Sequence, residues 1–231
     1  MKKIINTLLS MSLISVASAQ VVITQTENFA FVPSGAQTLN FSTFDSTLGT
    51  LNSVTVSVLL NKEGGNLQVD NDSAEGGSII LTHGVVGSLS STNVSLVDLT
   101  GSVIGGSGSL STSDSFTTTV GASSGDATNA FNATGADDFV TFNPTDTSVS
   151  DSGGIFFTAD YETIGAGSFA LDVNAIQTTN AAGLGGLQQA FTVSNVSGAV
   201  TVEYNFTAVP EPSSTLLSGI GLLGLMARRR R

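Results

Sequence analysis

The sequence predicts an all-β fold class: a single β-sandwich (jelly-roll-like) domain between an N-terminal signal peptide and a C-terminal short hydrophobic helix. Residues 51–58 and 199–206 alternate apolar and small polar side chains, the period-two pattern of half-buried strands. Many other short apolar runs are bounded by Gly, Asn, Asp, Ser or Pro. No segment of the body keeps the 3.6-residue apolar period of an amphipathic helix.

Residues 1–19 form the predicted signal peptide. Two lysines precede an apolar run over residues 4–16, and the small residues Ala17 and Ala19 end the segment. A basic start, an apolar centre and small residues at the end are the three parts of a secretory signal peptide. We expect signal peptidase to cleave after Ala19 and the rest of the chain to be exported.

The body, residues 20–208, is predicted to be built from short strands. In the first alternating segment Val54, Val56 and Val58 are expected to face the core, and in the second the inner residues are Val200, Val202, Tyr204 and Phe206. Further strands are expected at residues 21–26, 78–83, 94–99, 116–120, 139–142, 155–160, 169–173 and 191–196. The low-complexity residues 101–115 are expected to form a flexible loop or a weak edge hairpin, and the glycine-rich residues 178–189 a loop.

The mature body is strongly acidic and has no cysteine. Lys62 is the only basic residue in residues 20–209, against 18 − 1 = 17 acids once Glu211 is left out, so the formal charge is 1 − 17 = −16. Such a surface cannot neutralise phosphates, which excludes nucleic acid and makes anionic headgroups poor partners. Without disulfides the fold must be held by core packing, for which one domain of this length suffices.

The closest approach to a cation site is an acidic turn. Asp70, Asp72 and Glu75 supply carboxylates ahead of two glycines, which makes them a weak calcium candidate. Ala74 stands where a calcium loop needs an oxygen donor, and Leu81 where it needs a final acid. The plain alternative is an acidic hairpin turn, and no cofactor other than this calcium ion is expected.

No catalytic residue is predicted, and the chain is not expected to be an enzyme. His83 is the only histidine, which excludes most imidazole catalysis and transition-metal sites and leaves a core or strand-edge role. No G-x-S-x-G elbow presents a nucleophile, while a glycosidase pair among the acids stays open. The chain has no Trp and only Tyr161 and Tyr204 to stack on sugar rings, and its 13 Phe are expected in the core.

Residues 209–231 form a distinct tail. Pro210, Glu211 and Pro212 precede an apolar run over residues 213–227, which as a helix would span only about 22 Å of a ~30 Å bilayer core. The chain then ends on a basic cluster that resists translocation and is expected to stay cytoplasmic: Arg228, Arg229, Arg230 and Arg231.

This tail resembles the PEP-CTERM sorting signal of Gram-negative bacteria. The resemblance implies that exosortase, a membrane-embedded cysteine enzyme of organisms that make extracellular polysaccharide, cuts at or near Pro210-Glu211-Pro212. The expected partners are therefore signal peptidase and exosortase during maturation, the inner membrane transiently, and extracellular polysaccharide. The expected location is the cell surface or the extracellular matrix.

A second resemblance lies in the body. Residues 41–54 are similar to the F-D-x-x-L-G-T-L-x-x-V pattern of the choice-of-anchor E domain, and residues 197–204 to its final strand. In this pattern Phe44 and Leu48 are expected to pack on the core and Gly49 to permit a tight turn. The resemblance implies an extracellular domain and no specific activity.

These features favour an exported, non-enzymatic protein with a structural or adhesive role at the cell surface. The alternative is a calcium-dependent carbohydrate-binding module, associated with exopolysaccharide, that uses the acidic turn.

Overall fold

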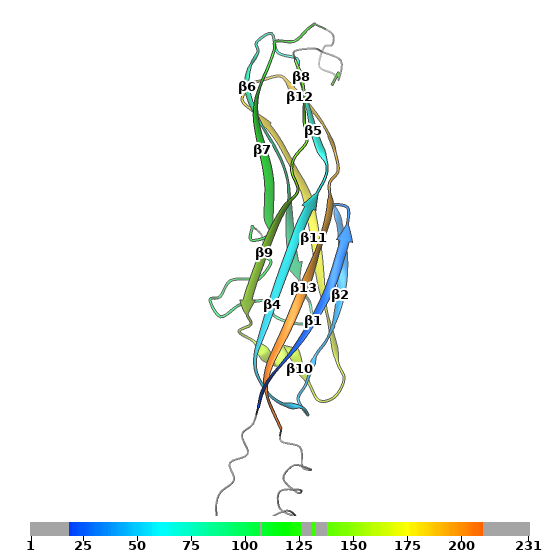
Figure 1. Cartoon of the computed structure of the whole chain (residues 1–231), viewed down its shortest axis with the longest axis vertical. Helices are drawn as coiled ribbons and strands as arrows, with labels where there is room; N and C mark the ends of the chain where they lie inside the picture. The colour runs from blue at the N-terminus through cyan, green and yellow to red at the C-terminus, as the bar shows by residue number, and fades with distance from the viewer. Residues whose placement is uncertain (1–18, 107, 126–130, 133–137, 210–231) are drawn as a thin grey trace, which may run out of the picture.

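The computed structural model describes residues 19–106, 108–125, 131–132 and 138–209, which fold into an elongated antiparallel β-sandwich (Figure 1). Its first sheet has the order β1-β13-β4-β9, formed by β1 (Gln20–Phe31), β13 (Asn195–Ala208), β4 (Gly49–Glu63) and β9 (Thr147–Gly154). Its second sheet has the order β2-β11-β6-β7, formed by β2 (Gly35–Ser42), β11 (Ser168–Ala182), β6 (Gly77–Ser90) and β7 (Ser111–Val120). The predicted all-β sandwich is confirmed.

The pairing of these long strands is that of a jelly roll. The strands of the two four-stranded sheets are, in chain order, β1, β2, β4, β6, β7, β9, β11 and β13. The first pairs with the last (β1 with β13), the second with the seventh (β2 with β11), the third with the sixth (β4 with β9) and the fourth with the fifth (β6 with β7). This nesting results when one long hairpin rolls up, and the additional pairs β13 with β4 and β11 with β6 then complete each sheet. The start of β1 and the end of β13 therefore lie side by side at one end of the sandwich (Figure 1).

Short strands extend the sandwich at both ends. Away from the termini, a sheet of order β12-β5-β8 is formed by β12 (Leu187–Thr192), β5 (Asn66–Asn71) and β8 (Phe139–Phe142) (Figure 1). It packs against the far part of β6 around a second apolar cluster made of Leu67, Val69, Ile79, Leu81, Val120 and Phe142. At the terminal end, the 3₁₀ turn η1 (Thr158–Tyr161) leads into β10 (Glu162–Thr163), which pairs in parallel with β3 (Phe44–Asp45).

The main core lies between the two four-stranded sheets, as the alternating segments predict. Val54, Val56 and Val58 of β4 are at most 1% exposed. The inner residues of β13 are buried as well: Val200, Val202, Tyr204 and Phe206. Since burial of apolar area contributes roughly 25 cal/mol per Å², such a core can stabilise a chain that has no disulfide.

Two of the predicted strands are wrong, and a third, at residues 191–196, is divided between the end of β12 at Thr192 and the start of β13 at Asn195. Residues 94–99 and 155–160 contribute only isolated bridges, which join Val97 to Val103 and Asp98 to Ile155. In the first segment Asp98 Oδ1 accepts hydrogen bonds from the main-chain N–H groups of Thr100 and Ser102, both at 2.8 Å. A side chain that bonds its own backbone favours a turn over a ladder. In the second segment the chain turns instead into η1.

The two predicted loops are shorter than expected. β7 begins at Ser111 inside the low-complexity residues 101–115 and pairs with β6. The glycine-rich residues 178–189 contain the end of β11 at Ala182 and the start of β12 at Leu187. Pairing with neighbouring strands overrides the weak local preference of these residues, as is common in sheets.

Apart from Ala19, the predicted signal peptide lies outside the described residues, and so does the predicted C-terminal hydrophobic helix. In the part of the chain that the structure describes, no helix has the length and hydropathy needed to cross a membrane.

Candidate functional site

Along the chain, the processing sites predicted from the sequence adjoin the first and last described residues, Ala19 and Val209. Ala17, Pro210-Glu211-Pro212 and the arginines Arg228, Arg229, Arg230 and Arg231 lie outside the described residues. Ala19, the residue before the predicted signal cleavage, is exposed, and its carbonyl accepts a hydrogen bond from Ala208 N at 3.1 Å. The described residues Ala19 and Ala208, close in sequence to the two predicted cleavage regions, are therefore next to each other in space.

A turn between β3 and β4 closes this end. Val209 N donates to Leu48 O at 3.0 Å, and Ser46 N donates to Thr163 O at 2.9 Å. Phe44 is buried as expected, but the prediction that Leu48 packs on the core is wrong, because its side chain is 48% exposed. The turn binds the last described residue through its main chain and points the leucine outward.

The three predicted calcium residues lie in different surroundings. Asp70, in β5, is 1% exposed, and its Oδ2 accepts a hydrogen bond from Asn132 N at 2.6 Å. Asp72 follows β5 and is partly buried, whereas Glu75 is exposed at the tip of the turn. The turn itself is held by Asn71, whose Nδ2 donates to Glu75 O at 3.0 Å. Glu75 is therefore exposed to solvent, whereas Asp70 is buried and Asp72 is partly buried.

Asp138 is the acid that the fold brings to this region. Asn71 N donates to Asp138 O at 2.9 Å, and Asp138 Oδ2 accepts from Ser124 N at 2.6 Å, a bond that lowers the pKa of this carboxyl. Its Oδ1 and both carboxylate oxygens of Asp72 are buried without a hydrogen-bond partner among the described residues. Within that same part of the chain, no group of three or more His, Cys, Asp or Glu side chains could hold a metal ion.

The single histidine and the single lysine of the body are buried where the two apolar clusters meet. His83 and Lys62 are both 0% exposed. The imidazole lies against the backbone of Gly65, where an added Cβ would come within 2.6 Å of His83 Cε1. Burial, and next the charge of Lys62, lower the pKa of His83. The expected core placement of His83 is confirmed.

The tyrosines are used inside the fold. Tyr161 OH donates to Ser95 O at 2.7 Å and Tyr204 OH to Ser42 O at 2.8 Å, and both rings are buried. Burial raises the pKa of both hydroxyls. Neither ring is available to stack on a sugar, so a carbohydrate contact would depend on other side chains.

The outer face of the β2-β11-β6-β7 sheet offers such side chains. Strand register places on this face a broad set of small hydroxyl and amide groups, here called the hydroxyl face: Thr38, Asn40, Ser42, Thr82, Ser88, Ser111, Ser113, Ser115, Thr117, Thr119, Asn174, Thr178 and Asn180. Asp172 is the one charged residue that these four strands place on the hydroxyl face, and it accepts a hydrogen bond from Thr38 Oγ1 at 2.5 Å. The face is therefore uncharged over most of its area on an otherwise acidic domain.

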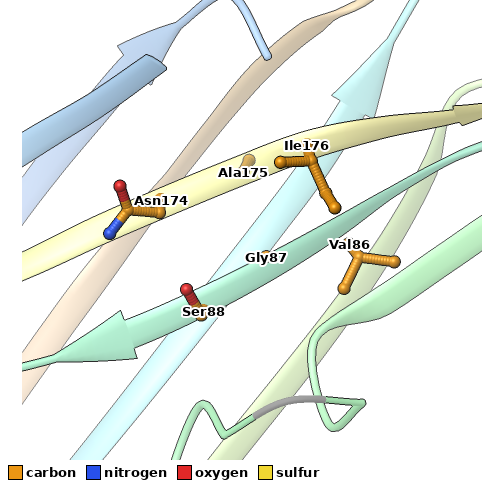
Figure 2. Close-up of a pocket in the computed structure, with 6 residues that line it drawn as sticks. All are labelled: Val86, Gly87, Ser88, Asn174, Ala175 and Ile176. Carbon is orange, nitrogen blue, oxygen red and sulfur yellow. The ribbon is translucent and has the colours of Figure 1, made fainter. Parts of the chain in front are cut away.

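A shallow depression lies in the middle of the hydroxyl face. Figure 2 shows Val86 and Ile176 opposite each other on β6 and β11, with Ser88 and Asn174 forming the next pair along. The depression holds about 250 Å³, less than the ~300–1,000 Å³ typical of clefts for small molecules. The geometry fits an extended surface contact better than an enclosed ligand.

Comparison with known proteins gives little for the domain itself. No curated protein matches the chain. A solved T13 particle of infectious bursal disease virus (IBDV) is similar at 16% identity and a TM-score of 0.20, over 85% of this chain and 41% of that one, so this chain spans less than half its length. A turnip yellow mosaic virus structure is similar at 10% identity and a TM-score of 0.16, over 84% of this chain and 99% of that one. Likenesses this weak carry no functional meaning.

The C-terminal tail does match a known family. The match covers residues 208–231 and does not extend to residues 21–207, so the resemblance of the body to the choice-of-anchor E domain stays a prediction. The matched motif implies processing by exosortase, export, transient membrane anchoring and display at the surface of a Gram-negative bacterium. Residues 208–231 are thus a PEP-CTERM protein-sorting motif, and the chain that carries it is an exosortase-sorted exported protein.

Proposed function

We propose that the sorted domain is a non-enzymatic adhesive component of the cell surface or extracellular matrix, and that its hydroxyl face binds neutral extracellular polysaccharide. The observation that carries this proposal is the face itself, which presents rows of Ser, Thr and Asn side chains at strand spacing with Asp172 as its one acid. Hydroxyl and amide groups both donate and accept hydrogen bonds, as sugar hydroxyls do.

The charge of the domain favours a neutral polymer. With a formal charge of 1 − 17 = −16 over residues 20–209, the domain repels polyanions. The hydroxyl face is where a neutral chain meets the fewest acidic groups. Repeated weak contacts along a polymer add up through effective concentration, so a shallow face suffices for adhesion.

Binding to a neutral polysaccharide tests the adhesive role. Asn174→Arg, at the depression, should weaken co-sedimentation of the mature protein with the polymer by about tenfold, which corresponds to ~1.4 kcal/mol. Thr55→Arg is the matched control, because Thr55 is exposed on the outer face of the other sheet. Equal binding by the two variants, or no binding by the unchanged protein, would contradict the proposal.

Sorting is tested separately. The tail should be cut at or near Pro210-Glu211-Pro212 only in cells that contain exosortase, and mass spectrometry of the mature protein should show the loss of the four terminal arginines. Removal of the arginines in cells without the enzyme would refute exosortase dependence.

The second candidate function, calcium-dependent carbohydrate binding, is favoured by one observation. Both carboxylate oxygens of Asp72 are buried without a hydrogen-bond partner among the described residues. Calorimetry with calcium should give binding heat that Asp72→Ala abolishes, whereas Glu75→Ala, at an exposed position, should retain it. The absence of heat in the unchanged protein would eliminate this candidate.

A further inference from the structure

We propose that the terminal end of the sandwich docks on the lipid bilayer while the protein is anchored, through an apolar end made of Leu48, Ile164 and Val209. These side chains are 48%, 84% and 59% exposed. The inference rests on the transient anchoring that the sorting motif implies, and not on polysaccharide binding.

Hydrogen bonds donated by main-chain N–H groups hold together the segments that carry these three residues. Val209 N donates to Leu48 O at 3.0 Å, and Gly165 N, next to Ile164, donates to Asp45 Oδ1 at 3.0 Å. β10 and β3 pair in parallel between these points. Figure 1 shows β10 and the ends of β1 and β13 together at one end of the long axis.

The length of the tether places this end at the membrane. Residues 210–212 alone separate Val209 from the apolar run at residues 213–227. At no more than ~3.6 Å per residue, Val209 can lie at most about 14 Å from Ser213. The polar interface of a bilayer is only about 5–8 Å thick on each side, so the terminal end must come close to it.

The charges at this end agree with shallow docking. Oδ1 of Asp45 is already engaged, since it accepts hydrogen bonds from Thr47 N, Thr47 Oγ1 and Gly165 N. Glu162 is exposed and limits the depth to which this end can enter the bilayer, because its carboxylate must stay in water. Exposed apolar side chains at an interface gain by entering the headgroup region to a depth of about 5–10 Å. The acidic body then extends away from the lipid along its long axis.

Tryptophan fluorescence of the full-length chain tests this docking. The protein has no Trp, so a single introduced Trp reports on its own surroundings. Ile164→Trp and Leu48→Trp would each be reconstituted without exosortase into phosphatidylcholine vesicles, with bromine on the lipid acyl chains close to the headgroup. Ile80→Trp is the matched control, because Ile80 is 49% exposed on β6 at the opposite end. We expect roughly twofold lower emission in brominated than in plain vesicles for the two terminal variants, and no change for the control.

A further variant separates docking from mere proximity. Leu48→Glu in the Ile164→Trp background keeps the tether and places a charge in the apolar end, so it should restore most of the emission. The proposal is overturned if Ile164→Trp and Leu48→Trp are quenched no more than Ile80→Trp, or if Leu48→Glu leaves the quenching of Ile164→Trp unchanged. In either case the exposed apolar side chains would face water or a protein partner instead of lipid.

Discussion

Lys62 donates a hydrogen bond from its buried ammonium to the main-chain carbonyl of Thr145 at 3.1 Å. The same threonine donates from its N–H and its hydroxyl to Asp114 Oδ2, at 2.7 and 2.9 Å. Lys62 belongs to β4 in one sheet and Asp114 to β7 in the other. Thr145 therefore links the two layers at the side where their edge strands β9 and β7 approach each other.

Replacement of Lys62 tests this link. Lys62→Met keeps a long side chain but removes the charged donor, so the free energy of unfolding should fall by about 1.5–3 kcal/mol. Lys62→Ala also leaves a cavity and should cost about 2–5 kcal/mol. Urea unfolding measures both. If Lys62→Met is as stable as the unchanged protein, the aliphatic stem and not the hydrogen bond stabilises this site.

Stability should fall as the pH drops below the ordinary pKa of histidine. Burial, and next the charge of Lys62, lower the pKa of His83 from 6.5. Between the folded pKa and 6.5 the unfolded chain binds a proton that the folded chain does not, so the free energy of unfolding falls as the pH falls through this window. The denaturant midpoint should be lower near pH 5 than above pH 7.

His83→Gln supplies the control for this pH dependence. Whatever the variant does to absolute stability, the difference between the two pH values should shrink, because glutamine does not titrate. An unchanged difference would assign the dependence to another group.

A separate loss of stability is expected in stronger acid. The main-chain N–H of Thr47 chiefly lowers the pKa of Asp45 from 3.8, and the hydroxyl of Thr100 that of Asp98. For acids with a lowered folded pKa, stability is present above 3.8 and is lost as the pH falls through the folded value. Asp98→Asn should therefore reduce the slope of the acid unfolding curve below this pH, as followed by circular dichroism. A slope equal to that of the unchanged protein would contradict the assignment.

The sequence predicted best the strands that have one buried face. Val54 and Tyr204 were assigned correctly to the core because their strands alternate strictly. The sequence did not predict β9 (Thr147–Gly154). Its register with β4 places Val149, Asp151 and Gly153 on the inner face, and only Val149 among them has a large apolar side chain, so the strand shows no alternating apolar pattern. Such a strand forms because β4 supplies a ladder partner, which local sequence does not reveal.

The candidate site was harder to predict, because it depends on pairing between distant segments. The hydroxyl face combines strands from β2 to β11, and nothing in the Ser and Thr content alone indicates which of these residues share a face. Likewise Asp138 reaches the acidic turn through the pairing of Asp70 with Phe139, whereas Glu75, close in sequence, points to solvent. The sequence pattern around Leu48 suits a core position, but the turn that carries this residue lies at the end of the sandwich, where its side chain is exposed.

The terminal end should be sensitive to one added methyl group. A Cβ at Gly49 would lie 2.1 Å from Thr207 O, so Gly49→Ala must separate β4 from the last residues of β13. Overpacking of this kind costs about 1–3 kcal/mol. We expect a lower unfolding midpoint and faster proteolysis near Ala208, because Gly49 is the ladder partner of that residue. Limited proteolysis with mass spectrometry locates the cut. Gly185→Ala is the control, since a Cβ there meets nothing within 4 Å; equal behaviour of the two variants would show that the end of β13 is not held by its close contact with Gly49.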